Sequence, residues 1–239
     1  MWIPIFGKER IVNRLSKLIL FGFGVLSLGV ILLSTGCGTS SKTQFRVMNA
    51  SPDESNLDVL IDGKSVATNL AYATATGYLS VSSGSRHLQI EPSGTTTPII
   101  DQMITLNSGT DTTILAANVS SSITAVVLAD DNSAPSSGNI KLRLVNASPS
   151  LGPADVYVNT PGTDINSVGP TISNLAFEAA SSYQSLTAAN YEVIFTNMGT
   201  KFIAIDSGSL SFSAGQIRTF VGLNSQTGGF AYAMLSDVN

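Results

Sequence analysis

The sequence predicts an all-β protein of two tandem immunoglobulin-like β-sandwich domains, which follow an N-terminal signal segment. Three observations support this prediction. The chain contains an internal repeat, its mature part alternates apolar and polar residues in short runs, and clusters of Gly, Pro, Asn and Ser separate these runs. Short strands with turn signals about every 8 to 12 residues are typical of a β-sandwich.

The internal repeat defines the organisation of the chain. Residues 45–52, FRVMNASP, return 97 positions later as residues 142–149, LRLVNASP. Residues 69–72, NLAY, return 105 positions later as residues 174–177, NLAF. The larger second offset means that the second copy carries about eight extra residues, near residues 160–164, and insertions of this kind occur in loops.

A polar segment with Pro and Gly separates the two copies. We assign residues 44–130 to the first β-sandwich, residues 141–239 to the second and residues 131–140 to the linker. So short a linker is expected to let the domains tilt but not to separate widely. Two copies are too few for a solenoid, which favours two tandem sandwiches.

The alternating runs predict six or seven short strands in the first copy. Asp62-Gly63 is a strong signal for a β-hairpin turn, because both residues tolerate a positive φ. Convincing helical periodicity occurs nowhere in the mature sequence. The predicted strands cover residues 44–49, 57–61, 77–81, 86–90, 99–106, 112–118 and 123–128.

Residues 1–36 have the plan of a signal peptide. Four basic residues between positions 8 and 17 precede an uncharged, almost wholly apolar stretch at residues 18–33. Gly36-Cys37 at its end resembles the lipobox of bacterial lipoproteins. The resemblance implies cleavage before Cys37, attachment of a diacylglycerol to its sulfur and acylation of the new amine, as with palmitate. Residues 37–43 would then be a lipidated tether.

Both interpretations of the N-terminal segment place the rest of the chain outside the cytoplasm, because basic residues stay inside. The alternative is an uncleaved membrane anchor, although the 16 residues 18–33 are fewer than the roughly 20 that span a bilayer. Gly38 after the cysteine, rather than Asp, resembles the context that sorts lipoproteins to the outer membrane. We therefore expect an exported protein that is anchored to a membrane by lipid on Cys37, at the outer membrane or cell surface.

Cysteine content and charge narrow the class of protein further. Cys37 is the only cysteine, so its lipidation leaves none for a disulfide. Outside the signal peptide, eight Lys and Arg remain against 15 Asp and Glu, a net charge of about -7. An acidic surface repels phosphate backbones, so we expect no nucleic-acid partner.

Both copies carry a longer shared pattern. The opening motif [Phe/Leu]-Arg-[Val/Leu]-x-Asn-Ala-Ser-Pro is followed by x-Asp-Val-[Leu/Tyr]-[Ile/Val], and later by Asn-Leu-Ala-[Tyr/Phe] with a downstream Tyr. This pattern, in residues 44–130 and 141–237, resembles the bacterial family called domain of unknown function 4397. The resemblance implies an exported or lipid-anchored envelope protein. It implies no catalytic residue, because the family has no established activity.

The residue types that most enzymes and metal sites require are scarce. His87 is the only histidine and its equivalent in the second copy is Glu192, so a hydrolase with a histidine base could exist only in the first copy. One histidine and one lipidated cysteine cannot supply a zinc site. We predict a non-enzymatic protein without a cofactor. The weak metal candidates are Asp130 and Asp131 at the linker, whose carboxylates could bind calcium.

The shared pattern contains one basic and one acidic residue in each copy. Arg46 and Asp58 return as Arg143 and Asp155. We expect each Arg and Asp either to pair across strands or to bond the backbone of turns, because their presence in divergent copies suits a requirement of the fold.

The shared Asn-Ala-Ser-Pro motif predicts a stiff turn. Asn49 and Asn146, with Ser51 and Ser148, are expected to bond local backbone in that turn. A duplicated ligand pocket built from the shared residues is the functional alternative.

We therefore predict a non-enzymatic cell-envelope lipoprotein that acts as a structural, adhesion or protein-interaction module, with an envelope protein as its expected partner. The alternative is a surface protein that binds a glycan or a small ligand, in which aromatic side chains stack on sugar rings. The aromatic candidates are Tyr72, Tyr78, Phe177, Tyr183, Tyr191 and Tyr232.

Overall fold

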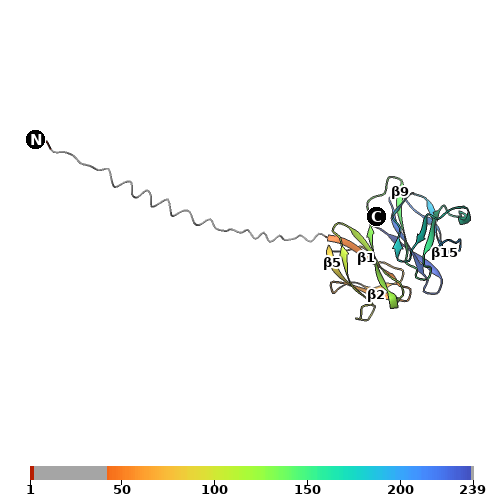
Figure 1. Ribbon diagram of the computed structural model, residues 1–239, viewed down its shortest axis with the longest axis horizontal. Coiled ribbons are helices and arrows are strands. Elements are labelled where there is room, and N and C mark those ends of the chain that lie inside the picture. The colour runs from red at the N-terminus through yellow and green to blue at the C-terminus, as the bar shows by residue number, and fades with distance from the viewer. Residues whose placement is uncertain (3–41, 238–239) are drawn as a thin grey trace. The chain divides into compact units, whose positions relative to one another are not determined.

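The computed structural model describes residues 1–2 and 42–237 (Figure 1). Residues Ser40–Asn239 form one compact unit that holds both repeats. Residues 3–36 of the predicted signal peptide, Cys37 and most of the tether lie outside the described residues. Among the residues that are described, no helix is long and apolar enough to cross a membrane.

The first repeat is a β-sandwich of two four-stranded sheets. The sheet with the order β4-β1-β7-β8 is called inner sheet 1, and the sheet with the order β3-β2-β5-β6 is called outer sheet 1. β1 pairs with β7 in parallel, and the other pairs are antiparallel. The strands are β1 (Lys42–Ala50), β2 (Asn56–Ile61), β3 (Lys64–Ala71), β4 (Leu79–Ser82), β5 (Gly84–Pro92), β6 (Ile100–Leu106), β7 (Asp111–Ala117) and β8 (Thr124–Asp130).

The second repeat has the same arrangement. Inner sheet 2 has the order β12-β9-β16-β17, with β13 also on β9, and outer sheet 2 has the order β11-β10-β14-β15. Here β9 and β16 are the parallel pair. The all-β prediction of two tandem sandwiches is confirmed. The strands are β9 (Asn139–Asn146), β10 (Ala154–Asn159), β11 (Ile172–Leu175), β12 (Ala179–Ala180), β13 (Gln184–Thr187), β14 (Asn190–Asn197), β15 (Ile203–Ser211), β16 (Ile217–Asn224) and β17 (Phe230–Ser236).

The predicted Asp62-Gly63 hairpin joins β2 to β3. Both residues have a positive φ, 51° and 72°, as a two-residue turn of type I′ requires. β3 itself is missing from the strands expected from the sequence. It lies at the edge of outer sheet 1 and is mostly exposed, with Leu70 as its one buried residue, so it lacks a buried apolar alternation.

A third apolar core lies between the two inner sheets. Along β1, Phe45 and Val47 pack in the core of the first sandwich, whereas Met48 and Ala50 on the opposite face pack against the second repeat. The expectation of domains that tilt about a linker is therefore wrong, because the repeats share a buried core within one compact unit. The shared core comprises Met48, Ala50, Leu115, Ala117, Val145, Ala147, Val221, Leu223 and Leu235.

Asp58 and Asp155 each support a bulge on the neighbouring edge strand. Asn69 and Asn174 have a left-handed φ of 57° and 55°, and their backbone N–H groups donate to Asp58 and Asp155 at 2.7 and 2.8 Å. The register of each strand pair shifts at this point. The Ser93 hydroxyl and the Asn69 amide lower the pKa of Asp58, because they stabilise the charged carboxylate.

The Asn-Ala-Ser-Pro turn is built around a fully buried asparagine. The Asn146 side chain accepts from Ser148 N at 3.2 Å and donates to Gly152 O at 2.7 Å and to Leu175 O at 3.1 Å. Asn49 makes the equivalent bonds in the first repeat. The turn bonds are the local role expected from the sequence, and the bond to Leu175 also ties the turn to β11.

Replacement of Asn146 by Ala leaves three backbone groups without their partner, two of them in buried residues, so we expect the free energy of unfolding to fall by about 2–3 kcal/mol. Urea titration followed by circular dichroism measures the change. Asn107→Ala, at an exposed position, is the matched control and should alter stability by less than about 0.5 kcal/mol. Equal losses in the two variants would contradict this role of Asn146.

Candidate functional site

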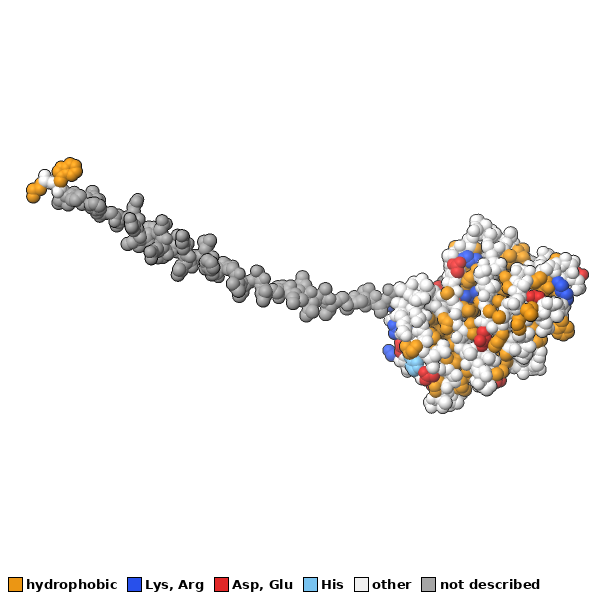
Figure 2. Space-filling view, in the orientation of Figure 1, with side chains coloured by type: hydrophobic (Ala, Val, Ile, Leu, Met, Phe, Trp, Pro, Cys, Tyr) orange, Lys and Arg blue, Asp and Glu red, His pale blue; other side chains and the backbone are white. Residues whose placement is uncertain are grey.

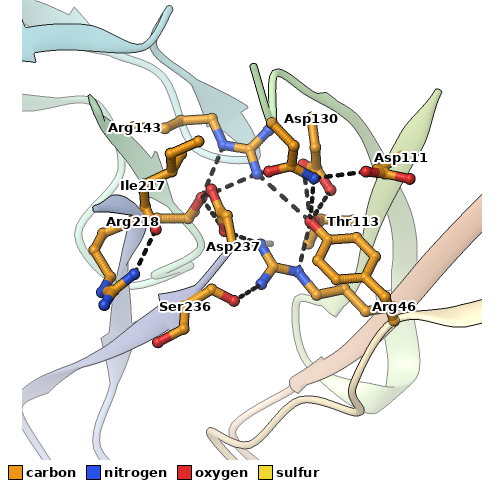
Figure 3. Close-up of polar contacts among 12 residues, drawn as sticks. Arg46, Asp111, Thr113, Asp130, Arg143, Ile217, Arg218, Ser236 and Asp237 are labelled. Atoms are coloured by element: carbon orange, nitrogen blue, oxygen red, sulfur yellow. Dashed lines mark hydrogen bonds and ion pairs between the residues drawn. The ribbon is translucent and has the colours of Figure 1, made fainter. Parts of the chain in front are cut away.

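Eight polar residues meet between the inner sheets, four from each repeat. Figure 3 labels Arg46, Thr113, Asp130, Arg143 and Asp237 among them. Each repeat supplies one Arg, one Tyr, one Thr and one Asp at equivalent positions of its sandwich. The Arg comes from the first strand of the repeat and the Asp follows or ends the last. We call this set the polar cluster: Arg46, Tyr78, Thr113 and Asp130 from the first repeat, and Arg143, Tyr183, Thr219 and Asp237 from the second.

Arg46 reaches from β1 into the second repeat. Its Nε donates to Thr113 Oγ1 at 2.9 Å within its own sandwich. Its Nη1 donates to Ser236 O at 2.7 Å, and its Nη2 forms an ion pair with Asp237. The side chains of Arg46 and Asp237 are 3% and 0% exposed, so this pair is shielded from water.

Arg143 makes the reciprocal set of contacts from β9. Its Nε donates to Thr219 Oγ1 at 3.2 Å in its own repeat. Its Nη1 donates to Ala129 O at 3.0 Å, and its Nη2 lies 2.6 Å from Asp130 Oδ1. Each repeat therefore supplies its arginine to the carboxylate of the other, an approximately two-fold exchange.

Each guanidinium is covered by a tyrosine of its own repeat. The guanidinium carbon lies 4.8 Å from the ring centre in both Arg46–Tyr78 and Arg143–Tyr183. The Tyr78 hydroxyl donates to Asp130 at 2.6 Å and the Tyr183 hydroxyl to Asp237 at 2.8 Å. Burial, together with the adjacent carboxylate, raises the pKa of both tyrosines, so both remain neutral donors.

The expected pairing of Arg46 with Asp58, and of Arg143 with Asp155, is wrong. The two aspartates lie on the outer sheets and hold the Asn69 and Asn174 bulges described above, whereas the two arginines face the other repeat. The aspartates do accept backbone hydrogen bonds, which is the second of the two roles expected for them.

The calcium interpretation of the linker acids is also not supported by their contacts. The Asp130 side chain is fully buried and accepts from Arg143, Tyr78 and Thr113. Asp131 pairs with Lys141 at 2.6 Å; this contact and Ser133 lower the pKa of Asp131 to about 2. Across residues 42–237, no three His, Cys, Asp or Glu side chains are grouped to hold a metal ion.

Sequence reasoning missed Asp237 and the two threonines of the polar cluster. One signal was available, because Leu128-Ala129-Asp130 returns as Leu235-Ser236-Asp237 at the end of the second repeat. The sequence does not show that each aspartate pairs with the arginine of the other repeat. Each copy alone contains Arg and Asp residues that could pair with each other.

The two repeats contribute apolar side chains of different size to the interface, although they contribute the same residue types to the polar cluster. At two equivalent positions of the shared core the first repeat has the larger side chain, and at a third the second repeat does. One close-packed core therefore combines a larger and a smaller side chain at each of these positions. The pairs are Met48 and Val145, Leu115 and Val221, and Ala117 and Leu223.

The other chemical candidates have structural contacts. His87 lies on β5 and its Nε2 is 2.5 Å from Asp101 Oδ1, a partly exposed pair that lowers the pKa of Asp101. The Tyr72 hydroxyl bonds Asn224 O across the repeats, and Tyr232 stacks on Phe220 with ring centres 4.7 Å apart. The polar cluster balances two positive with two negative charges, and it can hold the repeats in one register.

Arg46→Met or Asp237→Asn alone leaves a buried charge without its partner, so we expect each to lower the free energy of unfolding by about 3–5 kcal/mol. The double variant should lose at least about 1 kcal/mol less than the sum. A double-mutant cycle by urea unfolding measures this coupling. Arg46→Met combined with Asp58→Asn is the control and should be additive within about 0.5 kcal/mol; coupling in the control pair alone would refute the exchange.

Val145→Met places two large side chains at equivalent positions of the shared core, and we expect it to cost about 1–3 kcal/mol through overpacking. Adding Met48→Val restores the total volume and should recover at least half of that loss. Thermal unfolding of the two single variants and the double variant measures the recovery. Simple addition of the two single effects would show that the sizes are not matched across the interface.

No curated protein sequence matches the chain. Matches among solved structures include the C-terminal domain of AlgF from P. aeruginosa, at 9% identity and a TM-score of 0.28, covering 42% of this chain and 98% of that one. The family 26 carbohydrate-binding module of Eubacterium rectale Amy13K, solved with maltoheptaose, matches at 10% identity and a TM-score of 0.26, covering 83% and 98%. A putative adhesin from Bacteroides ovatus matches at 10% identity and a TM-score of 0.24, covering 82% and 92%. Values this low carry no argument about ligand or activity.

A family model matches the chain twice, over residues 43–157 and residues 141–239. The two matches together cover both sandwiches, including every residue of the polar cluster. The chain therefore belongs to the family described as domain of unknown function DUF4397 and carries two copies of that domain.

Proposed function

We propose that this protein is a non-enzymatic lipoprotein of the bacterial envelope, whose two locked sandwiches act as one rigid structural, adhesion or protein-interaction module. The observation that carries the proposal is the reciprocal exchange of Arg46 and Arg143 between the repeats. A buried polar cluster and a shared core make the two domains one body, which suits a protein that presents a fixed surface at a distance from its anchor.

The anchoring part of the proposal is supported by the N-terminal sequence. Cys37 follows an apolar stretch and Gly36, and β1 begins at Lys42, five residues later. Five residues span at most about 18 Å. Lipid on Cys37 would therefore keep the end of the body at which β1 begins close to the membrane surface, and the proposed location is the outer membrane or cell surface.

The non-enzymatic part is supported by how the charged groups are used. The buried acids and bases of the polar cluster neutralise one another. The histidine is held by Asp101 in a surface pair. An enzyme of the hydrolase or proton-transfer type needs an accessible group with a tuned pKa in a cleft, and these groups have other roles.

A protein partner is favoured by an apolar tip that only the second repeat has. Met198, Phe202 and Ile203, at the turn between β14 and β15, are 50%, 69% and 44% exposed. The equivalent residues of the first repeat are Ser93, Thr97 and Pro98. Exposed apolar groups clustered on one turn are typical of interaction surfaces.

The second repeat also braces this turn. The eight-residue insertion places Ile165 and Val168 against Tyr157 on outer sheet 2. Lys201, from the same turn as Phe202, lies 4.6 Å from the Tyr157 ring centre and donates to Ile165 O and Val168 O at 2.5 and 2.8 Å. The apolar tip is therefore fixed in position by contacts that the first repeat lacks.

The glycan alternative is less well supported. Of its candidate aromatics, Tyr78 and Tyr183 cover the buried arginines, and Tyr191 and Tyr232 pack on Phe212 and Phe220. A sugar-binding platform needs aromatic faces that are free to stack, and these rings are already in contact with the protein.

Cys37→Ser removes the proposed lipid acceptor. We expect cells fed labelled palmitate to label the wild-type protein and the Ser40→Ala control, but not the Cys37→Ser protein. Membrane fractionation and pull-down of envelope partners from the same cells show whether the lipid is the anchor. A Cys37→Ser protein that still carries label, or labelling of neither protein, would refute lipidation at this residue.

A further inference from the structure

A groove of about 540 Å³ opens between the two sheets of the first repeat, at the end of the sandwich where β1 begins. It lies where the edge strands β3 and β4 leave the sandwich unclosed. Its volume is within the range of small-molecule sites. The apolar lining comes from Phe45, Ile61, Val66, Leu79 and Val81.

The second repeat provides an internal comparison for this groove. Arg86, at the rim of the groove, corresponds to Tyr191 in the second repeat. Tyr191 packs on Phe212 with ring centres 6.2 Å apart, and both belong to the core of the second sandwich. The same place in the fold therefore holds a cation in one repeat and an aromatic pair in the other.

The rim of the groove carries a fixed positive charge. Arg86 donates to Ser82 O at 2.8 Å and to Ser83 O at 2.7 Å, and it pairs with Asp62 at 3.1 Å. Lys64 also lines the groove and is exposed, and among residues 42–237 it has no ion-pair partner. Two cations against one acid leave a net charge of about +1. Figure 2 shows that, on the visible face of the folded part, charged side chains of both signs lie among polar and hydrophobic ones.

We propose that this groove binds a long-chain fatty acid, with the alkyl chain against the apolar lining and the carboxylate at Lys64 and Arg86. Apolar lining and a cationic rim together match an anion with one apolar tail, because burial of the chain drives binding and a charge-assisted hydrogen bond orients the head. A neutral apolar ligand would leave Lys64 without its counter-charge. A small sugar would leave the apolar lining uncovered.

The proposal does not depend on lipidation of Cys37. The groove belongs to the unit Ser40–Asn239, which contains all four sheets and all three large cores and can therefore be studied without the N-terminal segment. A Cys37→Ser protein that still carries label would contradict lipidation at this residue but not the fatty-acid site. Absence of fatty-acid binding would contradict the site but not the lipid anchor.

Isothermal titration of the folded unit Ser40–Asn239 with palmitate, below its micelle concentration, tests the proposal. We expect saturable binding of one palmitate per protein. Methyl palmitate, which has no carboxylate, should bind with an affinity at least about five-fold lower. Lys64→Glu should weaken palmitate binding by about five-fold or more, because it replaces an exposed attractive charge with a repulsive one. Lys42→Glu makes the same charge change at the same end of the sandwich but outside the groove, and it should change affinity by less than about two-fold.

Val66→Trp places an indole in the groove and should abolish binding while the far-ultraviolet circular dichroism stays unchanged. If this variant unfolds, the comparison of Lys64→Glu with Lys42→Glu decides alone. Equal weakening by the two charge reversals would overturn the proposal, because it would show general attraction of an anion. Binding that does not saturate, or that a folded Val66→Trp protein retains, would overturn it as well.

Discussion

The rest of the structure depends on the exchange of arginines between the two repeats. A guanidinium that is 3% exposed must have its charge and its hydrogen bonds satisfied inside the protein. In this fold the carboxylate that does so belongs to the other repeat, for Arg46 and for Arg143 alike. Neither sandwich can bury its first strand on both faces unless the other is present. The two domains of the sequence are therefore interdependent in stability, and the linker contributes less to their arrangement than the interface does.

The interface separates two tasks. The polar cluster has the same residue types in both repeats, and its directional hydrogen bonds define one register of the inner sheets. The apolar side chains around it differ in size between the repeats. Met48 is larger than its equivalent Val145, and Ala117 is smaller than its equivalent Leu223. Two first repeats would combine the larger side chains at two of these positions, and two second repeats would combine the smaller ones there. Size differences of this sort favour the unlike pair and disfavour each like pair, as in other interfaces that discriminate among similar partners.

Much of the fold could be predicted from the sequence, because the repeat, the alternation and the Asp62-Gly63 turn act locally. β3 could not, since an exposed edge strand carries little apolar pattern. The sequence also did not predict that both faces of β1 are buried. An arginine in a strand, such as Arg46, is normally expected to face solvent, but here the inner sheet of the second repeat covers it. The candidate site was found only in part. Arg46 and Arg143 stood out because both copies have them, but their partners lie 191 and 13 residues away, and no rule of spacing connects an arginine with a carboxylate across a domain boundary.

The long separation of Arg46 from Asp237 bears on the order in which the chain reaches its folded state. β1 precedes every other strand in the sequence, yet its parallel partner β7 lies 67 residues further on. The buried ion pair of Arg46 forms only with Asp237, directly after the last strand of the second repeat. Contacts this distant in sequence form slowly, because the intervening chain must be ordered first. A polypeptide with this topology therefore gains the stability of its buried ion pairs and shared core only once both repeats are complete.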